Sequence, residues 1–289
     1  MYPAPFEYHT PGTVDEAVSL LKQHGDDAKV LAGGHSLLPL MRLRFAQPGH
    51  LVDLRKISGL SGIREIDGGV LIGATTTHRM LETSAVLMRR IPILPEAARL
   101  IGDALVRNRG TIGGSLAHAD PGADLPAVIL ALGAELTVVG QKGTRTIKCE
   151  SFFTGVLTTA LAPEEVITEI RIPDLPPGTG TAYAKHPHPA SRFAVVGVAA
   201  VLTLDGKTIR HARVAITGVA DHAVRATAVE NALTGQGAGD EALSAAAAHA
   251  ADGLELRGDS QGPPEYKKAL VTRYTLTALT RAAARAVRA

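Results

Sequence analysis

Arg107–Pro121 reads RNRGTIGGSLAHADP, and this segment does most to decide how the chain folds. It brings together three glycines and two hydroxyl residues. Glycines let the backbone come close to a ligand, and successive free N–H groups in a glycine-rich turn can hold phosphate oxygens. The sequence therefore predicts a phosphate-binding loop, followed by a helix over 125–132 with Asp124 as its N-cap. The alternative is an ordinary glycine loop.

Working outward, Ala32–Pro39 reads AGGHSLLP and follows a short apolar run, 29–32, that we expect to be a buried strand. It is not a P-loop, because the Gly-Lys-Ser/Thr ending is absent, and it is not a Rossmann fingerprint, because G-x-G-x-x-G is absent. The two glycine segments together would hold a pyrophosphate from both sides. Asp124 would accept hydrogen bonds from ribose or ribityl hydroxyls. The alternative for Ala32–Pro39 is a structural turn.

The rest of the chain predicts an α+β protein. Thr13 and Glu16 form a capping box, and Gly25 can end the helix that follows. Asp67-Gly68 marks a tight hairpin turn, and Pro173–Gly180 is a plausible domain boundary. Further helices are expected over 78–88, 94–105, 226–233, 241–251 and 265–288, the last with Tyr266, Leu270, Tyr274 and Ala278 along one ridge. Further strands are expected at 51–54, 63–66, 70–73, 136–139, 146–148, 166–172, 194–204 and 209–219.

Composition limits the classes of function. The 289 residues carry a net charge of +2, and only 3% of them are aromatic, with no tryptophan. Neither a basic stripe nor a base-stacking surface for nucleic acid is expected. At about 100–200 residues per domain, the length predicts at least two domains.

Cys149 is the only cysteine. One cysteine forms no internal disulfide and cannot build a zinc or iron–sulfur site alone, so any metal centre that works with this chain must be held by another polypeptide. His186 and His188 alternate along a strand, but two ligands make a poor metal site. No stretch approaches the roughly 18 apolar residues of a membrane span, and the first ten residues do not resemble a signal peptide. We therefore expect a cytoplasmic protein.

Taken together, AGGHSLLP and RNRGTIGGSLAHADP resemble the two FAD-binding signatures of the molybdenum hydroxylase flavoproteins. This family includes the medium subunit of carbon monoxide dehydrogenase and the flavin domain of xanthine dehydrogenase. The resemblance continues in three other segments, in the family's order: YPAPFEYHTPGTVDEAVSLL from Tyr2, EEVITEIRIP from Glu164 and AYAKHPHPASRFAVVGVAAVL from Ala182. It therefore covers nearly the whole chain.

The resemblance implies a two-subdomain FAD-binding region of the PCMH, vanillyl-alcohol-oxidase-like type over 1–176, with subdomains of about 1–55 and 56–176. A smaller sheet-plus-helices C-terminal domain would fill 177–289. The cofactor site is implied to comprise the segment Ala32, Gly33, Gly34, His35, Ser36 and Leu37, the segment Thr111, Gly113, Gly114 and Ser115, and the separate residues Asp124, Ile167 and Lys185. Ile167 would pack near the flavin ring, and Lys185 would stabilise the reduced ring by its charge. Phe193 stands where relatives place a residue beside the ring.

By the same resemblance, this chain carries FAD as an electron relay and has no catalytic residues of its own. A large subunit with the molybdopterin cofactor would oxidise the substrate. A small subunit would pass electrons through two [2Fe–2S] clusters to FAD, and an external acceptor such as a quinone would take them. The expected assembly is a dimer of heterotrimers, with peripheral contact to the inner membrane face through its partners. Carbon monoxide is the favoured substrate. The alternatives are an N-heterocycle or aldehyde oxidised by a related molybdenum hydroxylase, and a free-standing flavin oxidoreductase.

Overall fold

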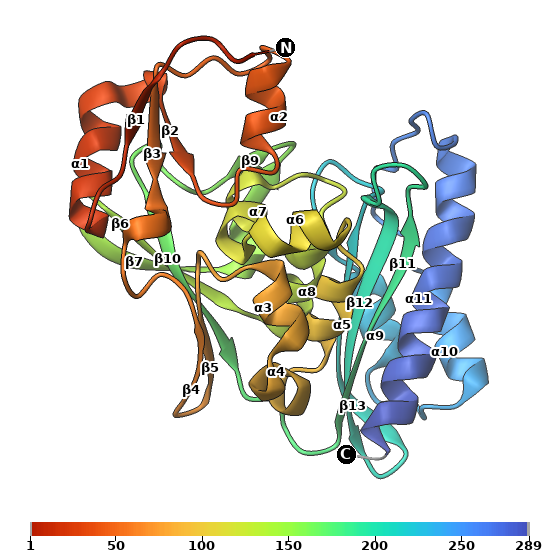
Figure 1. Cartoon of the computed structure of the whole chain (residues 1–289). Coiled ribbons are helices and arrows are strands. Elements are labelled where there is room, and N and C mark those ends of the chain that lie inside the picture. Colours follow the sequence, from red (N-terminus) through yellow and green to blue (C-terminus); the bar gives the residue numbers. More distant parts are fainter. Residues whose placement is uncertain (1, 288–289) are drawn as a thin grey trace.

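The computed structural model describes residues 2–287 and shows an α+β chain built on three main sheets (Figure 1). The first sheet is small and parallel, in the order β1-β3-β2, and consists of β1 (Glu7–His9), β2 (Ala28–Leu31) and β3 (His50–Asp53). Its connections hold α1 (Val14–His24), a 3-10 turn (Gly25–Asp27) and α2 (Leu37–Arg42). A second 3-10 turn (Leu54–Lys56) follows β3.

Helix α1 begins as its capping box predicts. The Thr13 hydroxyl accepts from the Glu16 amide at 3.2 Å, and the Glu16 carboxylate accepts from the Gly12 amide at 2.7 Å. The reciprocal bond therefore reaches one residue before the cap. Gly25 ends the helix with a positive φ of 53°, and the apolar face of α1 packs in the core of this first region.

The second sheet is antiparallel, in the order β4-β5-β10-β6-β7. Its strands are β4 (Ile63–Ile66), β5 (Gly69–Gly73), β6 (Glu135–Gly140), β7 (Gly143–Lys148) and β10 (Val166–Pro173). A 3-10 turn (Cys149–Ser151) and the short hairpin of β8 (Phe153–Gly155) and β9 (Thr158–Thr159) lie between β7 and β10. Cys149 is buried, and burial raises the pKa of its thiol to about 12, so it is an unreactive packed side chain.

Two long helices predicted between β5 and β6 are each broken in two. The first divides into α3 (His78–Thr83) and α4 (Ala85–Arg90), because the Ser84 hydroxyl accepts from the Leu87 amide at 3.3 Å and starts a new helix. The second divides into α5 (Ile93–Arg99) and α6 (Ala104–Arg109). Gly102 takes a positive φ of 44° there, and Asp103 caps the next helix through the Val106 amide at 2.9 Å.

The third sheet is antiparallel, in the order β11-β12-β13-β14, and is covered on both faces (Figure 1). Its strands are β11 (Thr179–Pro187), β12 (Ala194–Asp205), β13 (Thr208–Thr217) and β14 (Val224–Arg225). Helices α9 (Thr227–Leu233), α10 (Asp240–Ala247) and α11 (Pro264–Ala286) form a core with one face. Helices α5 and α8 (Asp124–Leu132) pack against the other face. Because β12 is buried on both sides, it reads as a continuous apolar run.

The predicted ridge of α11 is wrong by part of a turn. Tyr266 is 42% exposed, and Leu270 and Tyr274 are only partly buried. Ala278 is buried as predicted, and the other residues of the buried stripe include Val271, Thr275, Leu279 and Ala282. The small residues of this stripe let α11 approach β11 closely.

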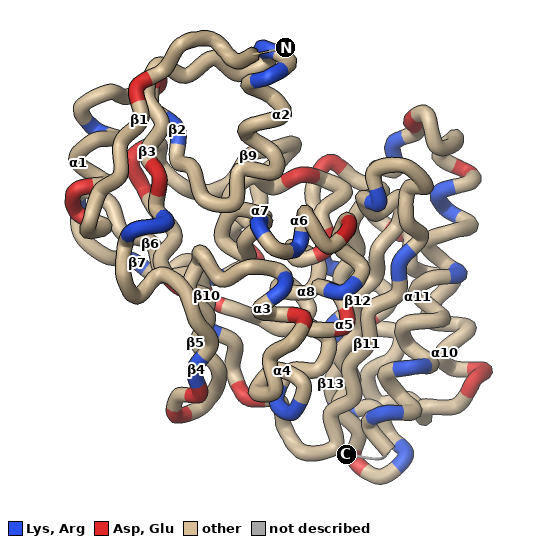
Figure 2. Tube along the Cα trace, viewed as in Figure 1, with Lys and Arg blue, Asp and Glu red and all other residues tan. Residues whose placement is uncertain are grey.

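Each main sheet and the helices that pack on it form one region of the chain, so that there are three regions. Charged residues of both signs are scattered over all three (Figure 2). Within residues 2–287, no helix has both the length and the apolar character that crossing a membrane would require.

Gly180 tests the close approach of α11 to the third sheet. A Cβ at this position would lie 1.9 Å from the Ala282 carbonyl oxygen and 2.3 Å from the Ala286 amide. We expect Gly180→Ala to lower the free energy of unfolding by about 1–3 kcal/mol through overpacking, measured by urea unfolding. The matched control is Gly237→Ala, where a Cβ would meet nothing closer than 4.0 Å. Equal stability of the two variants would contradict this packing.

Candidate functional site

A cavity of about 530 Å³ opens where the three regions meet. One wall is the turn after β2, and a second is the start of helix α7 (Ile112–His118). A third wall is the segment 159–165 before β10, and residues 191–193 of the β11–β12 turn reach in from the third region. This size is typical of a cofactor pocket.

The first glycine segment has the free amides that its sequence predicts. Gly34 takes a positive φ of 78°. Among residues 2–287, the backbone N–H groups of Gly33, Gly34, His35 and Ser36 donate to no other group. Each of these residues lines the cavity. Four successive unpaired amides form a cradle for an anionic oxygen.

The second glycine segment is not the predicted loop. Thr111 is the N-cap of α7, and its hydroxyl accepts from the Gly114 amide at 3.1 Å. The amides of Ile112 and Gly113 donate to the Thr76 and Ala74 carbonyls at 3.0 and 2.8 Å. The amides of the first turn of this helix are therefore already hydrogen-bonded to other groups of the protein. Gly113 is a packing residue, since a Cβ there would lie 2.7 Å from Ala74.

The two segments touch through backbone atoms. A Cβ on Gly33 would lie 2.3 Å from the Arg109 carbonyl oxygen, so only glycine allows this approach. Gly114 has no such backbone neighbour. A Cβ there would meet the Thr111 hydroxyl at 2.8 Å and Ala32 at 4.0 Å, and would fill the gap between the two walls. Gly114 is therefore the position at which a side chain would most directly obstruct a ligand.

Asp124 is the first residue of α8, and the N-cap position belongs to Ala123, which corrects the prediction that Asp124 caps this helix. Both carboxylate oxygens of Asp124 are engaged by β11. Tyr183 donates its hydroxyl to Oδ1 at 2.6 Å, and Lys185 donates its ammonium to Oδ2 at 2.8 Å and to the Leu100 carbonyl at 3.0 Å. The Lys185 and Asp124 side chains are only 2% and 4% exposed. The Lys185 charge is thus neutralised inside the protein.

Electrostatics agree with this arrangement. Burial raises the pKa of the Asp124 carboxyl, and Lys185 and Tyr183 oppose that rise. Burial and the Asp124 carboxyl together raise the pKa of the Tyr183 hydroxyl well above its usual value. Tyr183 therefore stays protonated and acts as a hydrogen-bond donor to Asp124.

Not all predicted site residues reach the cavity. Those that line it are Ala32, Gly33, Gly34, His35, Ser36, Leu37, Thr111, Gly114, Ser115, Asp124 and Phe193. Gly113, Ile167 and Lys185 are outside the lining. Ile167 is 5% exposed in the core beneath the second sheet.

Other functional residues were missed from the sequence. Tyr183 holds Asp124 across 59 positions of the chain, a pairing that no local pattern signals. His78 lines the cavity, and its Nδ1 is buried with no hydrogen-bond partner among the described residues. Burial lowers the pKa of His78 to about 4, so its ring is neutral near pH 7. Arg192 and the segment 159–165 also line the cavity and had no glycine signature to reveal them.

The lining fits a long ligand with a phosphate group. Among the described residues, the lining contains one lysine, Lys29, and one arginine, Arg192. Free amides of the first segment would therefore do most to hold an anion, with Gly114 leaving room beside them. FAD has this shape and charge, so the residues present fit the cofactor that the sequence suggests.

Fold and cavity together define an FAD-binding flavoprotein. The family described as the FAD binding domain in molybdopterin dehydrogenase matches residues 4–175. The family described as the CO dehydrogenase flavoprotein C-terminal domain matches residues 181–282. The chain belongs to the FAD-binding medium subunits of the molybdenum hydroxylases, oxidoreductases of the carbon monoxide and xanthine dehydrogenase type. The family resemblance of the sequence is thereby confirmed.

Relatives match over the full length. The carbon monoxide dehydrogenase medium chain of Hydrogenophaga pseudoflava is 46% identical, with 99% of each chain covered. A solved structure of carbon monoxide dehydrogenase from the same organism superposes with a TM-score of 0.96 at 48% identity, covering 99% of each chain. Subunit alpha of the 6-hydroxypseudooxynicotine dehydrogenase complex of Paenarthrobacter nicotinovorans is 39% identical, covering 98% of this chain and 97% of its own.

The gap at Gly114 can be tested by filling it. We expect Gly114→Val to keep the fold, as measured by circular dichroism. Its FAD content should fall at least about tenfold below that of the wild type, because a branched side chain would occupy the space between the walls. FAD is measured by absorbance after denaturing the purified protein. Gly155→Val is the control, since a Cβ there meets nothing within 4 Å and lies outside the cavity. Full flavin occupancy in Gly114→Val would refute this role.

The buried ion pair allows a double-mutant cycle. Lys185→Met leaves the Asp124 carboxylate buried without its cation and should lower the free energy of unfolding by about 3–5 kcal/mol. Adding Asp124→Asn should recover part of this loss, giving a coupling energy of about 1 kcal/mol or more in urea unfolding. Lys207→Met removes an exposed lysine and is the control. The pair has no structural role if Lys185→Met is as stable as Lys207→Met.

Proposed function

We propose that this chain is the electron-relay subunit of an aerobic carbon monoxide dehydrogenase. A large molybdenum-containing subunit would oxidise carbon monoxide. A small subunit would carry two [2Fe–2S] clusters, and an external acceptor, such as a quinone, would receive the electrons. The expected assembly is a cytoplasmic dimer of heterotrimers that reaches the inner membrane face through its partners. The full-length likeness to a carbon monoxide dehydrogenase medium chain supports this choice.

One observation supports a relay over substrate chemistry: the carboxylates around the cavity are already engaged. Tyr183 and Lys185 occupy both oxygens of Asp124. Glu165 is bonded to Arg145 at 2.7 Å and to the Ala162 amide at 2.8 Å, and Asp120 accepts from the Gly122 amide at 2.8 Å. These hydrogen bonds hold each carboxylate in a fixed position, and a lone pair that remains on an Asp124 oxygen can still accept from a cofactor hydroxyl. This lining suits binding a cofactor better than transforming a substrate.

Bound FAD would supply a ring that takes up and releases electrons. The residues of this chain would bind and position it. The free amides of Gly33, Gly34, His35 and Ser36 would hold the pyrophosphate, and Thr111, Gly114 and Ser115 would form the facing wall. Asp124 would accept hydrogen bonds from the cofactor's hydroxyls while Tyr183 and Lys185 fix its orientation. Phe193 would contribute to the ring's surroundings.

A second candidate keeps the relay but changes the substrate. The relative from P. nicotinovorans belongs to a dehydrogenase complex for 6-hydroxypseudooxynicotine, at an identity not far below that of the carbon monoxide dehydrogenase chain. An N-heterocycle or an aldehyde would be oxidised on the partner subunit in the same way. A free-standing flavin oxidoreductase is less well supported, because the full-length relatives are a medium chain of carbon monoxide dehydrogenase and a subunit of a dehydrogenase complex.

The native assembly tests both parts of the proposal. Carbon monoxide should reduce the molybdenum centre and, through this chain, a dye acceptor. In assemblies with Gly114→Val, dye reduction should fall at least about tenfold while reduction of the metal by carbon monoxide keeps its rate. Rapid-mixing spectroscopy follows the two steps separately, with Gly155→Val as the control.

Two results would contradict the proposal in different ways. If the wild-type assembly oxidises 6-hydroxypseudooxynicotine or an aldehyde but not carbon monoxide, the substrate is wrong and the relay stands. If Gly114→Val slows metal reduction itself in an intact assembly, the chain is not a pure relay.

A further inference from the structure

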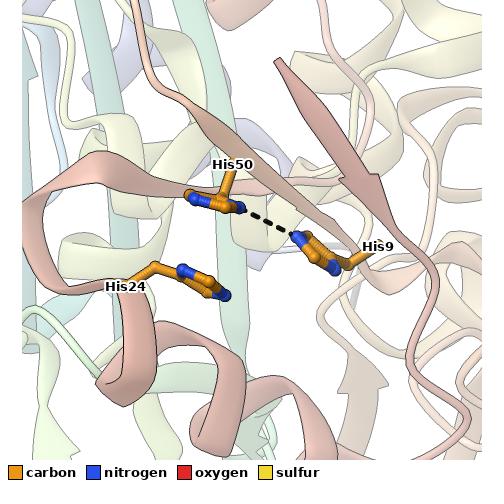
Figure 3. A group of neighbouring side chains, drawn as sticks. All are labelled: His9, His24 and His50. Carbon is orange, nitrogen blue, oxygen red and sulfur yellow. Dashed lines mark hydrogen bonds between the residues drawn. The ribbon is translucent and has the colours of Figure 1, made fainter.

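Three histidines far apart in the sequence meet at one end of the first sheet (Figure 3). His9 ends β1, His24 ends α1 and His50 begins β3. One ring nitrogen from each lies within 4.8 Å of the other two. We call His9, His24 and His50 the histidine triad. It lies outside the cavity described above.

The fold explains why the triad forms. In the parallel register of β1 and β3, Glu7 is the partner of His50. Side chains two residues apart on a strand point to the same face, so Glu7, His9 and His50 share one face of the sheet. His24 follows the buried residues Ala17 and Leu21 at helical spacing, so the end of α1 brings its ring to that face.

The ring contacts are close and only partly satisfied. His9 Nε2 lies 3.0 Å from His50 Nδ1, so in the neutral state one of these nitrogens donates to the other. The rings of His24 and His50 stack with centroids 3.6 Å apart. His24 makes no side-chain hydrogen bond to any residue in the range 2–287. All three pairs of rings are stacked, at interplanar angles of 27°, 29° and 23°, and apart from the His9–His50 bond their ring nitrogens make no hydrogen bond to one another. Rotation of the rings about their side-chain torsions would direct one lone pair of each toward a shared ion.

The surrounding charge is negative. A Glu7 carboxylate oxygen lies 3.5 Å from His50 Nδ1 and 3.9 Å from His9 Nε2. An Asp27 carboxylate oxygen lies 3.9 Å from His50 Nε2, the ring's other nitrogen. The carbonyl end of α1 points to the same place and carries partial negative charge. The triad is thus a favourable location for a cation.

We propose that the histidine triad binds a divalent transition-metal ion of the zinc class. His9 Nε2, His50 Nδ1 and a ring nitrogen of His24 would be ligands, with Glu7 as the fourth. Two nitrogens on a tetrahedral zinc ion lie about 3.3 Å apart, near the present spacing of His9 and His50. Imidazole ligands favour zinc, copper, nickel and cobalt over magnesium or calcium. Asp27 would orient the metal-bound His50 ring from behind, an arrangement common at zinc sites.

The ion would act as a structural clip. It would tie β1, α1 and β3 together at one end of the first region, the same region that presents the Ala32–Leu37 segment to the cavity. Because the metal binds the folded state only, it would raise the melting temperature of the chain. Protons compete for the same lone pairs, so metal affinity would weaken on acidification.

The test uses the full chain, stripped with a chelator, and titrated with zinc chloride or cobalt chloride. We expect one ion per chain by elemental analysis after gel filtration, a higher melting temperature, and the visible bands of tetrahedral cobalt. His24→Gln and His9→Gln should each weaken zinc binding at least about tenfold. His211→Gln, which changes an exposed histidine on β13, is the matched control and should bind as the wild type does.

The proposal is overturned if the wild type binds zinc no more tightly than His24→Gln, or if His211→Gln weakens binding equally. Should one triad variant fail to fold, the other gives the same comparison. FAD content is measured in parallel and should not change. A loss of metal binding is therefore distinguishable from a failure of the flavin site.

Discussion

The buried contact between Asp124 and Lys185 joins the flavin-binding region to the C-terminal sheet. Asp124 begins α8, and Lys185 and Tyr183 lie on β11, so one carboxylate fixes how two regions meet beside the cavity. A charge pair with both side chains almost fully buried is costly to separate, because either partner alone would remain in an apolar setting. The pair fixes the Asp124 carboxylate at the lining of the cavity, while Lys185 lies outside that lining.

The site relies on backbone more than on charge. Four unpaired amides after β2 form the anion cradle, and Gly33 brings that turn against the Arg109 carbonyl. Such a cradle lets backbone amides approach an anion closely with no side chain between them, which suits a bound cofactor. The carboxylates of the lining are already hydrogen-bonded, which also suits the binding of a cofactor. These features suit a protein that binds and positions FAD.

Local patterns predicted the class of each element better than its limits. Ser84 and Gly102 each divide a helix that apolar periodicity alone would continue, because capping bonds and a positive φ compete with propagation. The segment at Gly113 looked like a loop, yet Thr111 caps it and neighbouring carbonyls accept its first amides. Glycine in that helix serves close packing against Ala74. A glycine-rich sequence does not show whether its glycines lie in a ligand-binding loop or in a closely packed helix.

The sequence by itself determined the α+β class, the capping box of α1, the long strand over 194–204 and the two glycine segments, because each depends on residues a few positions apart. Only the tertiary structure decided which atoms of those segments stay free. It alone paired Asp124 with Tyr183 and Lys185, 59 and 61 positions away, and brought the histidine triad together. The physical reason is that periodicity and capping act over one or two turns of chain. Hydrogen bonds between distant side chains depend on strand register and helix packing, which no short stretch of sequence specifies.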